Sequence, residues 1–164
     1  MKTINILTGP VQSGKTTRLI AWVKYHRHSA GILSPVINKK RYIYSILKDN
    51  YRILESIKDD PAVGEDTIKI GKYSFLQSTF LWAREELRIA IEKKPLYMVI
   101  DEIGPLELSG QGLEPMVSHL LQNYQRSENH RLILVVRDHL LEAVVSHYQL
   151  QDTYLADHTF LSIP

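Results

Sequence analysis

Eight residues near the amino terminus form a pattern that binds phosphate groups. They fit G-x-x-x-x-G-K-[ST] and read, in order, Gly9, Pro10, Val11, Gln12, Ser13, Gly14, Lys15 and Thr16. Glycines let backbone N–H groups approach a polyphosphate closely, and the lysine brings a flexible positive charge to its β- and γ-oxygens. The Thr16 hydroxyl suits Mg²⁺, and Thr17 follows it in the expected helix. This segment, the phosphate loop, predicts a site for a nucleoside triphosphate and Mg²⁺.

Two acids, Asp101 and Glu102, follow the apolar run at residues 96–100. Ligands of open α/β sheets bind at the carboxyl ends of strands, so we expect both acids beside the phosphate loop. Asp101 is expected to hold Mg²⁺ together with Thr16, and Glu102 is expected to polarise an attacking water. Gly104 completes a short D-x-x-G pattern, in which a glycine N–H meets the γ-phosphate.

Arg137 follows another apolar run, residues 132–136. We expect it at the same sheet edge, where a guanidinium can stabilise charge that develops on the γ-phosphate. The structural alternative is that Arg137 caps the strand or forms an ion pair with Asp138. Lys15, Glu102 and Arg137 are thus the expected catalytic residues.

The elements that must position these residues alternate between strand and helix. Apolar periodicity predicts strands at 3–8, 31–37, 96–100, 131–136 and 158–163, and helices at 14–27, 74–93, 113–126 and 138–148. The second helix range, 74–93, opens with a capping-box pattern, Ser74 to Gln77. Such alternation predicts a three-layer α/β fold with a mainly parallel sheet.

The middle of the chain, about residues 38–72, breaks this rhythm. Residues 41–47 and 51–54 flank a turn and predict a β-hairpin, and residues 67–70 predict a third short strand. Residues 61–66 are expected to form a loop. We expect an antiparallel extension of the sheet, inserted within one domain that spans residues 1–164.

The composition excludes some classes of function. The chain has no cysteine, so it forms neither disulfides nor thiolate metal sites, and its histidines show no metal-binding spacing. No apolar run reaches membrane-spanning length and no signal peptide is evident, which predicts a cytoplasmic protein without membrane contact. Residues 1–94 carry 17 Lys and Arg against 9 Asp and Glu, whereas residues 95–164 carry 3 against 9. The basic first part suits polyphosphate or nucleic acid, and the acidic remainder suits Mg²⁺.

With these motifs, the chain resembles a family of small nucleoside triphosphatases known from thermophiles and from human. The resemblance rests on the phosphate loop, on residues 70–73 (I-G-K-Y) and on residues 101–108 (D-E-I-G-P-L-E-L), in that order. It implies a RecA-like fold, nucleotide contacts at residues 9–16 and 101–107, and slow Mg²⁺-dependent hydrolysis of ATP, GTP and other triphosphates. Many members carry a T-x-E-x-R-like segment after the second strand, where this chain has residues 34–39, S-P-V-I-N-K.

Guanine-specific GTPases carry an [NT]-K-x-D segment, and the candidate at residues 38–41, N-K-K-R, lacks the aspartate. Broad base tolerance is therefore expected. Two alternatives stay open. The first is a kinase that transfers the phosphoryl group to a nucleotide or small metabolite, with an acceptor site in the β-rich middle. The second is a nucleotide-gated switch whose basic part binds RNA or a protein.

Overall fold

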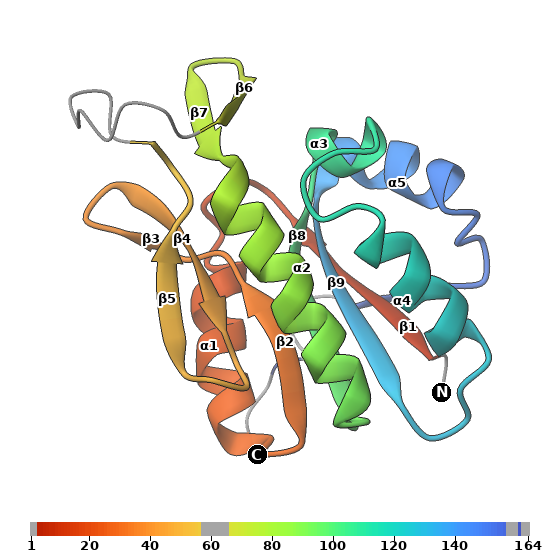
Figure 1. Ribbon diagram of the computed structural model, residues 1–164. Coiled ribbons are helices and arrows are strands. Elements are labelled where there is room, and N and C mark those ends of the chain that lie inside the picture. The colour runs from red at the N-terminus through yellow and green to blue at the C-terminus, as the bar shows by residue number, and fades with distance from the viewer. Residues whose placement is uncertain (1–2, 57–65, 157–160, 162–164) are drawn as a thin grey trace.

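A mostly parallel sheet of eight strands forms the centre of the computed structural model (Figure 1), which describes residues 3–56, 66–156 and 161. The strand order is β10-β1-β9-β8-β2-β4-β3, and β5 pairs with β4. Neighbours from β10 to β2 are parallel, and the pairs that involve β4 are antiparallel. The sheet strands are β1 (Ile4–Gly9), β2 (Ser29–Leu33), β3 (Val36–Ile37), β4 (Lys40–Ser45), β5 (Asn50–Ile53), β8 (Tyr97–Ile103), β9 (Arg131–Arg137) and β10 (Tyr154–Ala156).

Helices cover both faces of this sheet. They are α1 (Lys15–Tyr25), α2 (Gln77–Glu92), α3 (Pro105–Leu108), α4 (Met116–Gln125) and α5 (Leu141–His147), with a 3₁₀ turn, η1, at Asp138–Leu140. Alternate residues of β9 face opposite sides: Leu132 and Leu134 pack with α2, α4 and α5, whereas Ile133 and Val135 pack with α1. Strands buried on both faces must be apolar throughout, which is why the continuous runs in β8 and β9 form the centre of the sheet. The predicted three-layer α/β fold is confirmed.

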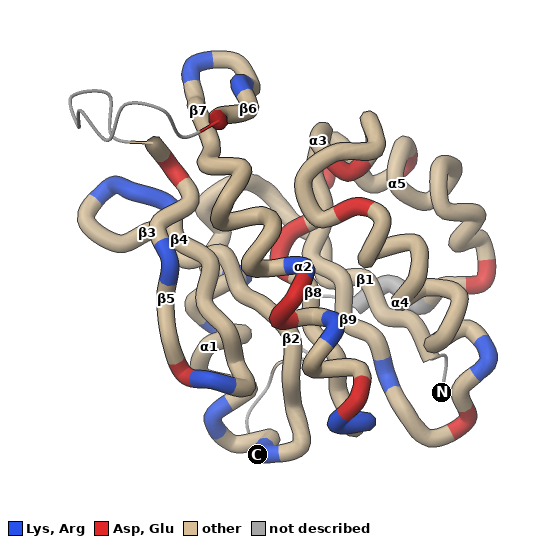
Figure 2. The backbone as a smooth tube through the Cα atoms, in the orientation of Figure 1, with Lys and Arg blue, Asp and Glu red and all other residues tan. Residues whose placement is uncertain are grey.

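The β-rich middle divides into two parts. The predicted hairpin is present as β4 and β5, and it extends the sheet antiparallel to β2. The strand predicted at 67–70 does not join that extension: it is β6 (Thr67–Ile70), which pairs with β7 (Tyr73–Leu76) in a separate two-stranded sheet. Figure 2 shows basic residues at the turns of both parts, the β3–β4 turn and the tip of the β6–β7 hairpin.

Two predicted elements differ clearly from the structure. The helix expected from residue 74 begins at Gln77, because Ser74 belongs to β7; Leu76 is the N-cap residue and no side chain caps the helix. The strand expected at 31–37 ends at Leu33, before Pro35, and resumes as β3. The last strand is β10, at residues 154–156; most of the range predicted for it, 158–163, and the loop at 61–65 lie outside the described residues.

Close backbone contact joins β2 to β8, the strand that ends in the two acids. Gly31 has φ +118°, and a Cβ atom there would lie 2.0 Å from the Val99 carbonyl oxygen. Glycine is therefore required at this position, because a larger residue would push the two strands apart. The contact fixes the end of β2 next to the end of β8.

Candidate active site

The phosphate loop connects β1 to α1, as its pattern predicts. Lys15 is buried, and its Nζ atom donates to the carbonyl oxygens of Gly9 at 2.9 Å and Pro10 at 2.7 Å, and to Ser13 Oγ at 3.2 Å. Gly14 is the N-cap residue of α1. The ammonium group is thus held inside the loop, beside the helix N-terminus, where unpaired N–H groups favour anions.

The rest of the loop is more open. Pro10, Val11 and Gln12 form an exposed turn. Thr16 and Thr17 lie in the first turn of α1, with Thr16 half-buried and Thr17 exposed. Thr16 therefore faces the interior of the site, whereas Thr17 lies at its solvent side.

A hydrogen bond of 2.7 Å joins the phosphate loop to the acidic strand end, across 85 residues of sequence. Thr16 Oγ1 donates to Asp101 Oδ2, and the same oxygen accepts the Ser34 backbone N–H at 3.1 Å. The predicted pair, Thr16 and Asp101, is thus in direct contact. The Ser34 contact was not predicted; the adjacency of β2 and β8 creates it, and no sequence motif signals that adjacency.

Asp101 is nearly inaccessible to solvent, at 2% exposure. Burial raises its pKa to about 6; the Thr16 hydrogen bond opposes the shift and the neighbouring Glu102 charge adds to it. Its second oxygen, Oδ1, is buried and has no hydrogen-bond partner. A carboxylate oxygen left unpaired in a buried site is costly, and a cation would satisfy it.

These two side chains fit the Mg²⁺ that the phosphate loop implies. A hydroxyl and a carboxylate with one unpaired oxygen are oxygen ligands of the kind that Mg²⁺ prefers, with waters and phosphate oxygens completing its shell. The described part of the chain contains no cluster of three or more His, Cys, Asp or Glu that could hold a metal by itself. Thr16 and Asp101 are therefore the residues that would hold the ion.

Glu102 and Arg137 form an ion pair of 2.7 Å at the same sheet edge. The parallel register places Arg137 opposite Gly9, at the start of the phosphate loop. Both side chains remain partly accessible, Glu102 at 20% and Arg137 at 30%. The ion pair joins Arg137 to Glu102 rather than to Asp138, the alternative considered from the sequence, and the predicted catalytic residues lie together.

Gly104 and Glu107 form part of the wall beyond the acids. The Gly104 N–H donates to Glu107 Oε2 at 2.9 Å, and the Leu113 N–H donates to Glu107 Oε1 at 3.0 Å. The Gly104 N–H, predicted to meet a γ-phosphate, is therefore already engaged within its own loop. Glu107 fixes that loop from inside, and burial raises its pKa to about 7.

A protein-family model described as NTPase matches residues 5–155. No curated protein sequence matches the chain.

None of the helices in the part of the chain that the structure describes is long and apolar enough to span a membrane.

Two solved structures share this fold. The crystal structure of THEP1 from the hyperthermophile Aquifex aeolicus has a TM-score of 0.71 at 18% identity, over 94% of this chain and 88% of that one. The solution structure of a human cancer-related nucleoside triphosphatase has a TM-score of 0.68 at 19% identity, over 96% of this chain and 88% of that one. Together with the family match over residues 5–155, these findings place the chain in the NTPase family, as a P-loop enzyme that acts on nucleoside triphosphates.

Proposed function

We propose that this protein hydrolyses nucleoside triphosphates to the diphosphate and phosphate, slowly, with Mg²⁺ and with broad base tolerance. The observation that carries the proposal is the 2.7 Å hydrogen bond between Thr16 and Asp101. It joins a loop built for phosphates to a carboxylate whose second oxygen is buried and unpaired. Mg²⁺ held there would neutralise phosphate charge.

The chain's own residues divide the remaining work. Lys15, the backbone N–H groups of the non-proline residues of the phosphate loop and the backbone N–H of Thr17 bind the β- and γ-phosphates. Glu102 accepts a proton from a water whose oxygen attacks the γ-phosphorus, and the bond between that phosphorus and the bridging oxygen breaks. Arg137 neutralises charge on the γ-phosphoryl oxygens as they separate.

The contacts that these residues make support the proposal of slow turnover. Arg137 is engaged by Glu102 at 2.7 Å, and Lys15 by two carbonyl oxygens and a hydroxyl. Each group must exchange these partners for phosphate or water before it can act. Such rearrangement reduces the fraction of protein ready for reaction.

Support for broad base tolerance comes from residues 38–41, the only partial match in the sequence to the guanine-recognition motif. Asn38 and Lys39 form the β3–β4 turn with positive φ, residues 40–41 begin β4, and the motif's aspartate is missing. Discrimination between bases above about 100-fold requires buried polar groups that pair with one base alone.

We also propose that the protein acts in the cytoplasm.

Phosphate release from ATP, GTP, CTP and UTP tests the proposal, with excess Mg²⁺ and with excess EDTA. We expect release from all four, within about 100-fold of one another in kcat/KM, and loss of release with EDTA. Nucleoside monophosphates added at millimolar concentration should leave release unchanged. A single strongly preferred base, or full activity in EDTA, contradicts the proposal.

A further inference from the structure

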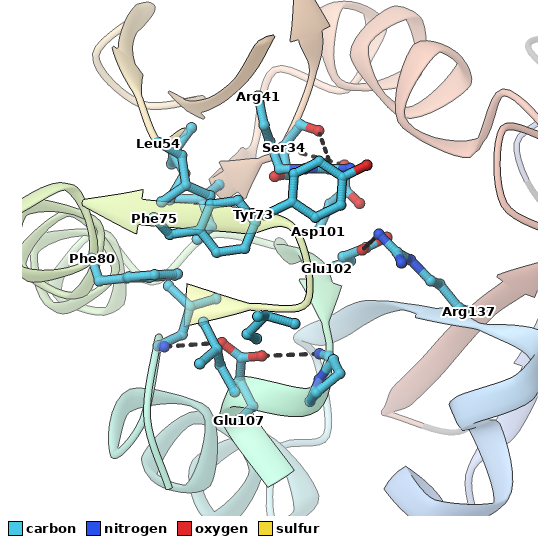
Figure 3. Close-up of a pocket in the computed structure, with 17 residues that line it drawn as sticks. Ser34, Arg41, Leu54, Tyr73, Phe75, Phe80, Asp101, Glu102, Glu107 and Arg137 are labelled. Carbon is cyan, nitrogen blue, oxygen red and sulfur yellow. Dashed lines mark hydrogen bonds and ion pairs between the residues drawn. The ribbon is translucent and has the colours of Figure 1, made fainter. Parts of the chain in front are cut away.

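A pocket of about 130 Å³ lies beside the candidate active site (Figure 3). Asp101, Glu102 and Arg137 form its edge, and no phosphate-loop residue is among the described residues that line it. Asp101, which lines the pocket, also accepts the Thr16 hydrogen bond, so the pocket adjoins the phosphate loop through this acid. A γ-phosphate that reaches Glu102 would lie between the phosphate loop and this pocket.

The opposite wall of the pocket is aromatic. Tyr73 and Phe75 come from β7, and Phe80 comes from the first turns of α2. The rings of Tyr73 and Phe75 are parallel within 4°, with centroids 6.0 Å apart, and Phe80 meets Phe75 edge-on. Tyr73 is 42% exposed. Exposed aromatic surface at an opening suits a ligand with a flat ring.

Water alone does not account for this wall. A nucleophilic water needs one polar acceptor, which Glu102 supplies, and gains nothing from apolar neighbours. Tyr73 is the most exposed of the three rings, and a ligand that covered it would bury apolar surface. The pocket is thus better suited to an organic molecule than to solvent.

The charges around the pocket favour an uncharged ligand. Its cations are Arg41 and Arg137, and its acids are Asp101, Glu102 and Glu107. Arg137 is paired with Glu102, and both Glu107 oxygens accept backbone hydrogen bonds. Two cations thus stand against three acids among the lining residues, so the lining has no excess of positive charge to attract a phosphate or carboxylate; Lys72 is not a lining residue, and its Nζ lies 5.3 Å from the Tyr73 ring centroid. Arg41, whose Nη1 makes a long contact of 3.5 Å to the Ser34 carbonyl oxygen, can donate to a neutral ring acceptor.

We propose that this pocket binds a second substrate, an uncharged molecule with a planar ring and a hydroxyl group, which takes the γ-phosphoryl group in place of water. The proposal rests on the role of Glu102 proposed above. The hydroxyl oxygen forms a bond to the γ-phosphorus, and the bond from that phosphorus to the bridging oxygen breaks. The hydroxyl proton passes to Glu102 and then to solvent. The products are a nucleoside diphosphate and a phosphate monoester.

The test uses ATP labelled in its γ-phosphate and five probes: adenosine, guanosine, cytidine, uridine and pyridoxine. Each has a planar ring, a primary hydroxyl and no net charge at pH 8. We expect label in the monophosphate of at least one probe, with less free phosphate. Free phosphate without labelled ester from any probe overturns the acceptor proposal and leaves hydrolysis standing. If neither labelled ester nor free phosphate forms, both the acceptor proposal and the hydrolysis proposal are overturned.

Variants of Tyr73 locate the acceptor. Tyr73→Leu removes the ring and should lower transfer to the accepted probe about tenfold, whereas Tyr73→Phe keeps the ring and should retain transfer. Tyr25→Leu is the matched control, because Tyr25 is 69% exposed at the end of α1. Circular dichroism is used to check that each variant is folded. Equal transfer by Tyr73→Leu and the wild type overturns the assignment to this pocket.

Discussion

Glu107→Gln tests whether a buried carboxylate holds the loop that follows β8. Glu107 is 4% exposed, and its two oxygens accept hydrogen bonds from the backbones of Gly104 and Leu113. Burial raises its pKa from 4.5 to about 7, although these donors oppose the shift. The folded protein therefore binds this proton more tightly than the unfolded chain does. Its free energy of unfolding falls as pH rises from the unfolded pKa to the folded one.

The magnitude follows from the two pKa values. The difference between 4.5 and about 7 corresponds to about 3 kcal/mol, of which about 2.5 kcal/mol is lost between about pH 5 and pH 8. Glutamine does not titrate, but its amide nitrogen cannot accept one of the two N–H groups, which costs about 1–3 kcal/mol at every pH. The destabilisation caused by Glu107→Gln should therefore shrink by about 2.5 kcal/mol from pH 5 to pH 8.

Urea unfolding, followed by circular dichroism in EDTA without nucleotide, measures this difference. The wild type and Glu107→Gln are compared at several pH values from about 5 to 8. Glu128→Gln is the control, because Glu128 is exposed. Asp101 titrates in all three proteins and cancels in the comparison. If the wild type and Glu107→Gln lose stability in parallel, the carboxylate has an ordinary pKa and the reasoning from burial is refuted.

Three other variants test separate parts of the structure. Lys15→Ala should weaken binding of a fluorescent ATP analogue and lower turnover together, because the ammonium faces phosphate before and during reaction; unchanged binding contradicts its role. Glu102→Gln should lower kcat by about 10²–10⁴ and keep the affinity for Mg²⁺-ATP, measured by single-turnover hydrolysis and titration, and hydrolysis at the wild-type rate excludes Glu102 as the base. Gly31→Ala should cost about 3 kcal/mol or more in urea unfolding, since its Cβ atom would lie 2.0 Å from the Val99 carbonyl oxygen at φ +118°. A loss under about 1 kcal/mol would mean that β2 and β8 separate easily.

The motifs with strong local chemistry were predictable from the sequence. The phosphate loop needs a strand before it and a helix after it, and the apolar periodicity of residues 3–25 supplies both. The acids at 101 and 102 could be placed at the same edge because parallel strands share their carboxyl ends. Their assigned roles stay predictions, as does the assignment of residues 1–164 to one domain.

The β6–β7 hairpin could have been predicted but was not. Two residues, Gly71 and Lys72, separate its strands, and a two-residue turn with glycine first is a hairpin signal. The capping-box pattern at Ser74 competed with that signal, and strand pairing prevailed. When a short pattern fits two kinds of element, tertiary contacts decide which one forms. Here the Leu76 N–H donates to the Leu54 carbonyl oxygen, and the Ser56 N–H donates to the Ser74 carbonyl oxygen.

The pocket was beyond sequence reasoning. Its walls include residues of β2, β4, β6, β7, α2, β8 and β9 and of the segment after β8, and no local sequence pattern shows that these elements meet. Arg41 was one of several basic residues with no distinguishing signal. Only the three-dimensional arrangement separates it from Lys39, in the β3–β4 turn, and Lys40, at the start of β4, neither of which lines this pocket.

The strand order has a consequence for how the protein is made. β1 and β2 are the first two sheet strands to be synthesised, yet β8 and β9, from the second half of the chain, lie between them. A nascent chain that has emerged only as far as α2 cannot pair β1 with its final neighbours. The phosphate loop can contact Asp101 only after β8 and β9 have inserted between β1 and β2. Non-local pairing of this kind is slow, so nucleotide binding begins late in folding and any fragment that ends before residue 137 should lack it.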